Sequence, residues 1–369
     1  MFLMTLYIHI PFCYKKCRYC SFAVFVAHQD YIEGYLECLS KESARYRGQK
    51  VKTIYIGGGT PSYLSIKQLE KLFSIIRDNF KFDKSIEWTF EANPESLDER
   101  KAIFLKNVGV NRLSLGVQTF QDKYLRYLGR NHSAGQSYQV YEILREAGFK
   151  NINLDFMYLF PGQTFDELKK DLKEIINLQS DHLSLYTLTI EKNSRFFVDK
   201  EKLPNEDVQA RYYLDVKKEL EKKAFKQYEI SNFAKRGKQS AHNLNYWQGG
   251  NYIGLGVAAH SHISGKRFWN HAHLATYINM IKEKGNAQEG FEELSDYNRL
   301  KESLLFGLRM NKGIKIIFLE KYYKARLTNE DWAMIQRLQK EKFLICHRGF
   351  LKITQKGQLV LDELCGYLA

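Results

Sequence analysis

Three cysteines near the start of the chain have the spacing of a metal-cluster site. Cys13, Cys17 and Cys20 follow an apolar run in the pattern C-x3-C-x2-C. Three thiolates on one short loop can hold an iron–sulfur cube, which normally takes four cysteines, so one iron keeps an open coordination position. A zinc site of the C-x2-C type needs a second pair of ligands, and no such pair follows at the expected distance. The spacing therefore predicts a [4Fe-4S] cluster with one iron free to bind a ligand.

Further polar residues stand where predicted strands end. Gly57–Thr60 follows one strand, and consecutive glycines let a backbone come close to a ligand. Glu91 ends the next strand, where an acid can accept hydrogen bonds from a ribose, and Gln118 and Asp155 lie on later strands. Several such residues around one opening predict a ligand site.

Alternating strands and helices must position these residues. The sequence predicts strands at 5–10, 53–57, 87–91, 112–115, 153–160 and 182–188. It predicts helices near 30–46, 66–79, 98–106, 137–147, 165–177 and 205–223. Alternation of this length favours a parallel sheet with right-handed crossovers. Six strand–helix units fit a partial barrel better than a closed barrel of eight strands. In such a barrel, ligands bind at the carboxyl ends of the strands.

The pattern changes after about Lys226. Further strands are predicted at 228–231 and 253–259, joined by a segment rich in His, Asn, Gly and aromatic residues. From residue 295 the chain is helical, and Arg348-Gly349 between two apolar runs predicts a β-hairpin, as in a winged-helix module. The expected fold is α/β: a partial (β/α)6 barrel over 1–226, a sheet extension over 227–294 and a small α+β winged-helix-like domain over 295–369.

Composition limits the class of protein. Six cysteines, three of them clustered, argue against a disulfide scaffold and for a reducing cytoplasm. No apolar run reaches the length of a membrane span, and Met1–Ile8 lacks the basic start of a signal peptide and predicts a first strand. The net charge of +14 is spread along the chain. It favours anionic partners such as nucleic acid, a membrane surface or carboxylate ligands, and also fits a role in solubility alone.

The cysteine loop resembles the signature of the radical SAM enzymes. In that superfamily the open iron binds S-adenosylmethionine, and an electron from the cluster splits its sulfonium to give a 5'-deoxyadenosyl radical. Over residues 1–265 the chain resembles the oxygen-independent coproporphyrinogen III oxidases and their relatives, and the run 304–314 resembles their appended domain. The resemblance implies that S-adenosylmethionine would contact Tyr7, Gly58, Gly59, Thr60, Glu91, Gln118, Arg130, Asp155 and Tyr186.

One departure indicates the branch of that group. The oxidases carry a fourth cysteine two residues after the third, where this chain has Phe22. Cys-Ser-Phe instead resembles the HemW branch, whose members are described as heme chaperones and carry a His-Asn-x-x-Tyr-Trp motif tied to heme. This chain has that motif at 242–247, which implies heme contacts from His242, Asn243, Tyr246 and Trp247.

The chemistry of this motif leaves two interpretations open. A histidine can ligate heme iron, and aromatic rings offer flat surface to a porphyrin face. Nearby Lys235, Arg236 and Lys238 would then pair with the propionates. Alternatively, Tyr246 and Trp247 pack a domain junction and His242 caps a turn.

A second histidine pair stands in Ala259–His262. One residue separates His260 from His262, so both side chains lie on the same face of a strand. A ligand role and a structural role are both compatible with this spacing.

The leading hypothesis is a heme chaperone on a radical SAM scaffold, with a [4Fe-4S] cluster, S-adenosylmethionine and heme. It would pass heme to an acceptor protein in the cytoplasm or at the inner face of a membrane, and would need an electron donor for the cluster. The alternative is an oxygen-independent coproporphyrinogen III oxidase, against which Phe22 counts. A third hypothesis, radical modification of nucleic acid, is not favoured, because the lysines are diffuse and no basic stripe with stacking aromatics stands out.

Overall fold

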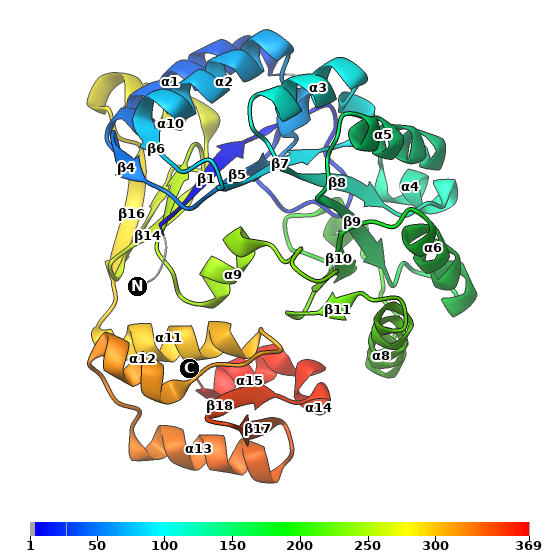
Figure 1. Ribbon diagram of the computed structural model, residues 1–369, viewed down its shortest axis with the longest axis vertical. Coiled ribbons are helices and arrows are strands. Elements are labelled where there is room, and N and C mark those ends of the chain that lie inside the picture. The colour runs from blue at the N-terminus through cyan, green and yellow to red at the C-terminus, as the bar shows by residue number, and fades with distance from the viewer. Residues whose placement is uncertain (1–3, 27, 369) are drawn as a thin grey trace.

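Six parallel strands form the centre of the protein (Figure 1). The computed structural model describes residues 4–26 and 28–368, so the part of the first-strand prediction on residues 1–3 lies outside it. The sheet runs in the order β10-β9-β8-β7-β5-β1. These strands are β1 (Thr5–Ile10), β5 (Thr53–Gly58), β7 (Glu87–Ala92), β8 (Arg112–Gln118), β9 (Ile152–Tyr158) and β10 (His182–Thr187).

Helices cover the outer side of this curved sheet (Figure 1). They are α1 (Ile32–Ala44), α2 (Ile66–Asn79), α3 (Glu99–Asn107), α5 (Ala134–Glu146), α6 (Phe165–Asn177) and α8 (Glu206–Glu221). Capping boxes at Ser65 and Thr164 fix the starts of α2 and α6, whose predicted bounds are confirmed. The predicted partial barrel is confirmed.

The predicted end of the strand at 112–115 is wrong. β8 continues to Gln118, and all seven of its residues are buried. Its register shifts between Leu115 and Gln118, where Gln118 has a φ of 68°. The strand thus ends in a bulge that no apolar pattern signals.

The sheet continues at both edges to twelve strands. Beside β1 lie β13 (Tyr252–Leu255), β14 (His260–Ile263), β15 (Lys266–Asn270) and β16 (Gln288–Glu293), and beside β10 lie β12 (Asn232–Ala234) and β11 (Lys226–Gln227). The strand predicted at 228–231 is wrong, because the chain turns there between β11 and β12. The one predicted at 253–259 ends at Leu255, since Gly256 and Ala258 have positive φ angles of 103° and 57°.

A short helix that was not predicted crosses the amino ends of the strands. α9 (Ala241–Trp247) holds the His-Asn-x-x-Tyr-Trp motif and begins at Ser240, whose hydroxyl accepts from the Asn243 amide at 3.3 Å. At the start of β7, the carboxylate of Glu87 accepts from the amides of Ala241 and His242, both at 2.9 Å. A carboxylate at a helix N-terminus stabilises it, so β7 fixes the position of the motif.

The C-terminal part has its own buried core. It comprises α11 (Asp296–Leu308), α12 (Ile316–Tyr323), α13 (Asn329–Lys340), β17 (Leu344–His347), β18 (Phe350–Ile353), α14 (Gln355–Gln358) and α15 (Leu361–Leu368). Arg348 and Gly349 between β17 and β18 both have positive φ angles, 51° and 76°, as a tight two-residue hairpin turn requires. The predicted hairpin and winged-helix-like domain are confirmed. The domain boundaries at 226 and 294 stay predictions.

Shorter elements complete the chain. They are β2 (Phe12–Cys13), β3 (Phe25–Val26), β4 (Gln49–Lys50), β6 (Phe80–Lys81), α4 (Asp122–Leu128), α7 (Arg195–Val198) and α10 (Leu274–Lys284), with 3-10 turns at Gln29–Tyr31, Pro61–Tyr63 and Pro94–Ser96.

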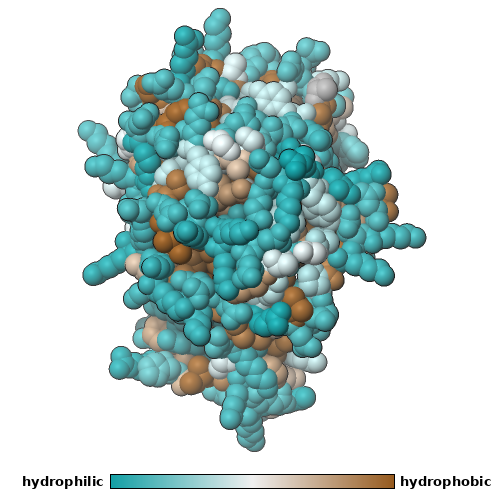
Figure 2. Space-filling model, turned by 90° about the vertical axis from the view of Figure 1, so that its right-hand side faces the viewer, coloured by the Kyte–Doolittle hydropathy of each residue, from teal (hydrophilic) through white to brown (hydrophobic). Residues whose placement is uncertain are grey.

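The outer surface is mostly polar. The side of the molecule shown in Figure 2 is largely hydrophilic, with small scattered apolar patches. Across residues 4–26 and 28–368, none of the helices has the length and apolar character that crossing a bilayer would take.

Glu42 joins α1 to the sheet extension. Its buried carboxylate accepts from the Asn270 amide at 2.6 Å, the Tyr277 hydroxyl at 2.8 Å and the Gly256 backbone N–H at 2.8 Å. These donors come from the ends of β15 and β13 and from α10, so one side chain ties three neighbouring elements together.

Replacing Glu42 with alanine is therefore expected to lower the free energy of unfolding by about 3 kcal/mol, because three buried donors lose their acceptor. Urea denaturation measures this change. Glu33→Ala on the same helix is the control, because the Glu33 side chain is 59% exposed and pairs only with Lys71. Equal loss of stability in the two variants would contradict the role given to Glu42.

Candidate functional site

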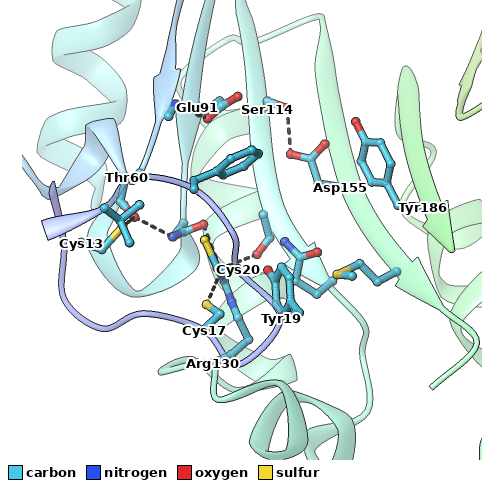
Figure 3. A pocket seen from close by; sticks show the side chains of 18 of the residues that line it. Cys13, Cys17, Tyr19, Cys20, Thr60, Glu91, Ser114, Arg130, Asp155 and Tyr186 are labelled. Atoms are coloured by element: carbon cyan, nitrogen blue, oxygen red, sulfur yellow. Dashed lines mark hydrogen bonds between the residues drawn. The ribbon is translucent and has the colours of Figure 1, made fainter. Parts of the chain in front are cut away.

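One large cavity opens at the carboxyl ends of the parallel strands. It has a volume of about 580 Å³ and reaches from the cysteine loop into the partial barrel. Figure 3 shows residues from the loop and from several strands directed toward this space. The predicted residues that line it are Cys13, Cys17, Cys20, Gly58, Gly59, Thr60, Glu91, Gln118, Arg130, Asp155, Tyr186 and Asn243.

Tyr7 lies apart from this group. It faces a neighbouring cavity, and its hydroxyl bonds to Nδ1 of His9 at 2.8 Å. The structure therefore gathers all but one of the residues predicted to contact S-adenosylmethionine around the larger cavity.

Backbone bonds hold the start of the cysteine loop against the end of β5. The amide of Gly59 donates to Ile10 and that of Thr60 to Phe12, at 2.8 and 2.9 Å. A Cβ atom on Gly59 would lie 2.9 Å from Sγ of Cys13. Only glycine fits here, so the close backbone approach that was predicted for this turn has a steric basis.

A hydrogen-bonded chain joins two of the cysteines (Figure 3). Cys13 Sγ lies 3.3 Å from the Thr60 hydroxyl, which accepts from the Asn93 amide at 3.0 Å. Oδ1 of Asn93 accepts from Nη2 of Arg130 at 2.8 Å, and Nη1 of Arg130 lies 3.5 Å from Sγ of Cys17. The guanidinium places a positive charge beside the sulfurs, and its Nε has no partner among the described residues.

Burial favours the neutral form of two of the thiols. Burial raises the pKa of Cys13 to about 11 and raises that of Cys20 as well. Cysteine binds metals as the thiolate. A bound cation must therefore stabilise the negative charge that burial disfavours. Among the described residues, no three His, Cys, Asp or Glu side chains are arranged to hold a single metal ion. An iron–sulfur cube binds each thiolate on a different iron, so the absence of a single-ion site does not argue against a cube. Three cysteines, the Gly59 cradle and the unpartnered Arg130 donor fit a cluster with a ligand on its open side.

Two partly buried carboxylates line the wall opposite the loop. Glu91 accepts from the Tyr55 hydroxyl at 2.6 Å and from the Gly58 amide at 3.0 Å. Burial raises the pKa of Glu91 to about 7. Asp155 accepts from Ser114 at 2.9 Å, and burial raises its pKa too. Carboxylates fixed in this way are suited to accept from the hydroxyl groups of a sugar.

Sequence reasoning missed several residues of this wall. Asn93, Tyr55, Arg112, Ser114 and Asn153 all line the cavity or bond to residues that do. A polar residue at every second position of an otherwise apolar strand was the available signal, since such residues share one face.

A second cavity of about 400 Å³ lies beside the first. Phe22, Tyr55 and Asn243 line both cavities, and His242 and Tyr246 line the second. The two sites therefore share a wall.

His242 is fully engaged within the protein. Nδ1 bonds to the Thr53 hydroxyl at 2.7 Å and Nε2 to the Tyr246 hydroxyl at 3.0 Å. Burial, with a smaller effect from Arg112, lowers the pKa of His242 to about 3, so the ring is neutral. Neither ring nitrogen is free to bind iron in this arrangement.

Trp247 packs against the C-terminal domain. The Arg309 guanidinium lies 4.9 Å from its ring centre, and the Phe306 ring lies 6.5 Å away. This is the junction role that the sequence left open as the alternative. The pairing of propionates with the nearby lysines is not supported, because Lys235 and Lys238 line a separate hollow beside Arg145.

Comparisons with known proteins agree with this fold. Residues 7–175 match the radical SAM superfamily, and residues 294–360 match the HemN C-terminal domain. The solved structure of coproporphyrinogen III oxidase (HemN) from Escherichia coli is similar over 100% of this chain and 90% of that one, with 25% identity and a TM-score of 0.89. The fold and the cysteine loop thus define a radical SAM protein, a class that implies a [4Fe-4S] cluster and S-adenosylmethionine.

Relatives narrow the class further. The heme chaperone HemW of Bacillus subtilis is 37% identical over 98% of this chain and 97% of its own length. That of Lactococcus lactis is 36% identical over 95% of this chain and 93% of its own. The chain belongs to the HemW family.

Replacing Gly59 with alanine is expected to prevent assembly of the cluster, because the added methyl group would occupy the space of Cys13 Sγ. Iron content and visible absorption after anaerobic reconstitution measure the effect. The matched control is Gly34→Ala in α1, where a Cβ meets nothing within 4 Å. Normal iron loading in Gly59→Ala would overturn this account of the loop.

Proposed function

We propose that this protein is a heme chaperone, which binds heme and passes it to an acceptor protein. Similarity over nearly the whole chain to proteins named heme chaperones carries the proposal. Phe22 supports it, since this residue stands where the oxidases have a fourth cysteine and its side chain lies, 64% exposed, between the two cavities. The heme acceptor, an electron donor for the cluster and a location in the cytoplasm or at the inner face of a membrane belong to the same proposal.

The larger cavity would hold the cluster and S-adenosylmethionine. Cys13, Cys17 and Cys20 would ligate the cluster, which supplies one-electron reduction when bound. Arg130 would keep the loop in place and offer its free Nε to the ligand.

The strand ends would orient the nucleoside. The methionyl part of S-adenosylmethionine would contact Gly58, Gly59 and Thr60. Its ribose would contact Glu91. Gln118, Asp155 and Tyr186 would form the rest of the wall, and the Tyr186 side chain, 42% exposed, faces the cavity.

The second cavity would take the heme. Its lining is mainly aromatic and apolar, from Tyr7, Phe22, Tyr55, Tyr246 and Tyr252. Flat apolar walls of this kind suit a porphyrin face. In this proposal His242, Asn243 and Tyr246 shape the floor of the heme site, and Trp247 anchors the motif to the C-terminal domain.

Anaerobic reconstitution followed by heme titration tests the function. The wild-type protein is expected to bind heme with a distinct Soret band. Cys17→Ala is expected to lose the broad absorption of the cluster and to retain heme binding, because Cys17 does not line the second cavity.

Two results would contradict the proposal. One is the absence of saturable heme binding by the wild-type protein. The other is robust conversion of coproporphyrinogen III to protoporphyrinogen under anaerobic conditions, which would make the protein an oxidase.

Affinity for S-adenosylmethionine is expected to fall as the pH drops through 7. Burial raises the pKa of Glu91 to about 7, so this carboxyl is ionised and able to accept hydrogen bonds above that pH and protonated below it. Between pH 8 and pH 6 the affinity is expected to fall by about tenfold. Calorimetric titration at several pH values measures the change. The Glu91→Gln variant should bind weakly throughout and lose this dependence; an identical pH profile in both proteins would exclude Glu91 as its source.

A further inference from the structure

We infer that His260, and not the histidine of the His-Asn-x-x-Tyr-Trp motif, is the axial ligand of the heme iron. This inference rests on the proposed function and names the residue that would bind the metal.

An axial histidine needs one ring nitrogen that points into the heme site without a protein partner. His242 does not meet this condition, because Thr53 and Tyr246 occupy its two nitrogens and it is 1% exposed. Binding iron there would break one of these bonds and open the packing around α9.

His260 does meet it. It is an exposed residue on β14, and neither of its ring nitrogens bonds to a residue that the structure describes. Its ring lies nearly parallel to that of Trp269, with 5.8 Å between the ring centres and 24° between the planes. This contact fixes the ring and leaves both nitrogens available.

His262, on the same face of the strand, is less suitable. Nδ1 lies 3.4 Å from the carbonyl oxygen of Gly250, and Nε2 is buried without a partner. It lines the cavity at the domain junction and does not line the aromatic cavity, so an iron in the aromatic cavity would not reach it.

The position of His260 joins two cavities. It lines the aromatic cavity beside the cluster loop and also a cavity of about 400 Å³ between the sheet extension and the C-terminal domain. Tyr246 and Tyr252 line both as well. A planar ring ligated by His260 would thus have one part against Phe22 and Tyr252 and its other edge toward the domain junction.

The junction cavity offers an arginine donor for one carboxylate of heme. Arg267 lines it and pairs with Glu292 and Glu302, both at 2.6 Å. Arg299 also lines it, and its buried Nε has no partner among the residues in the described ranges. A propionate at Arg299 would satisfy this donor.

Heme titration of the anaerobically reconstituted full-length protein tests the assignment. His260→Ala is expected to weaken heme binding at least about tenfold and to shift the Soret band, as loss of a metal ligand does. Adding free imidazole to His260→Gly should restore the wild-type spectrum, which a purely structural role would not do. His273→Ala is the control, because His273 is exposed and borders none of these cavities.

The competing variant is His242→Gln, which alters the floor of the heme site and is expected to lower the affinity for heme without moving the Soret band, because the iron ligand is kept. The inference fails if His260→Ala keeps the wild-type spectrum and affinity, or if His242→Gln alone loses the Soret band while its circular dichroism shows a folded chain. In both cases the wild-type protein still binds heme and the proposed function stands. Absence of heme binding by the wild-type protein would refute the function itself.

Discussion

The buried guanidinium of Arg130 fixes the geometry on which the rest of the site depends. It reaches the cysteine loop at Cys17, the end of β7 at Asn93 and the carbonyl oxygen of Gly116 in β8. Arginine suits this position because its planar group offers several donors in fixed directions, which lysine does not. The neighbouring Arg18 holds the same loop to the end of α4, where its amide donates to the Leu128 carbonyl at 3.0 Å. The contact from Arg130 adds the direct connection between Cys17 and the strand ends.

The two ends of the barrel strands hold different parts of the site. The carboxyl ends of the strands carry the cysteine cavity, and the amino ends hold α9 through Thr53 and Glu87. Tyr55 lies between them: its hydroxyl donates to Glu91, and its ring centre is 5.0 Å from that of His242. A change in one cavity would therefore alter the wall of the other, which connects the His-Asn-x-x-Tyr-Trp motif physically to the cavity beside the cysteine loop.

Much of the barrel and of the cysteine site could be predicted, and the reasons are local. Strands that are buried on both faces have continuous apolar sequences. Capping residues such as Ser65 and Thr164 mark the starts of helices. Cysteine spacing is likewise a local signal. The surroundings of His242 could not be predicted, because Thr53 and Glu87 bond to α9 from strands far away in the sequence. For the same reason His260 could not be preferred from the sequence, because its free nitrogens are recognised only when its neighbours are known.

The central claim is that three cysteines hold a cube whose fourth iron is open to S-adenosylmethionine. Electron paramagnetic resonance of the reduced, reconstituted protein, recorded with and without S-adenosylmethionine, tests it most directly. Adding the nucleoside is expected to change the signal of the cluster, because the nucleoside binds at the open iron. An unchanged signal, or one from a mononuclear metal, would contradict it.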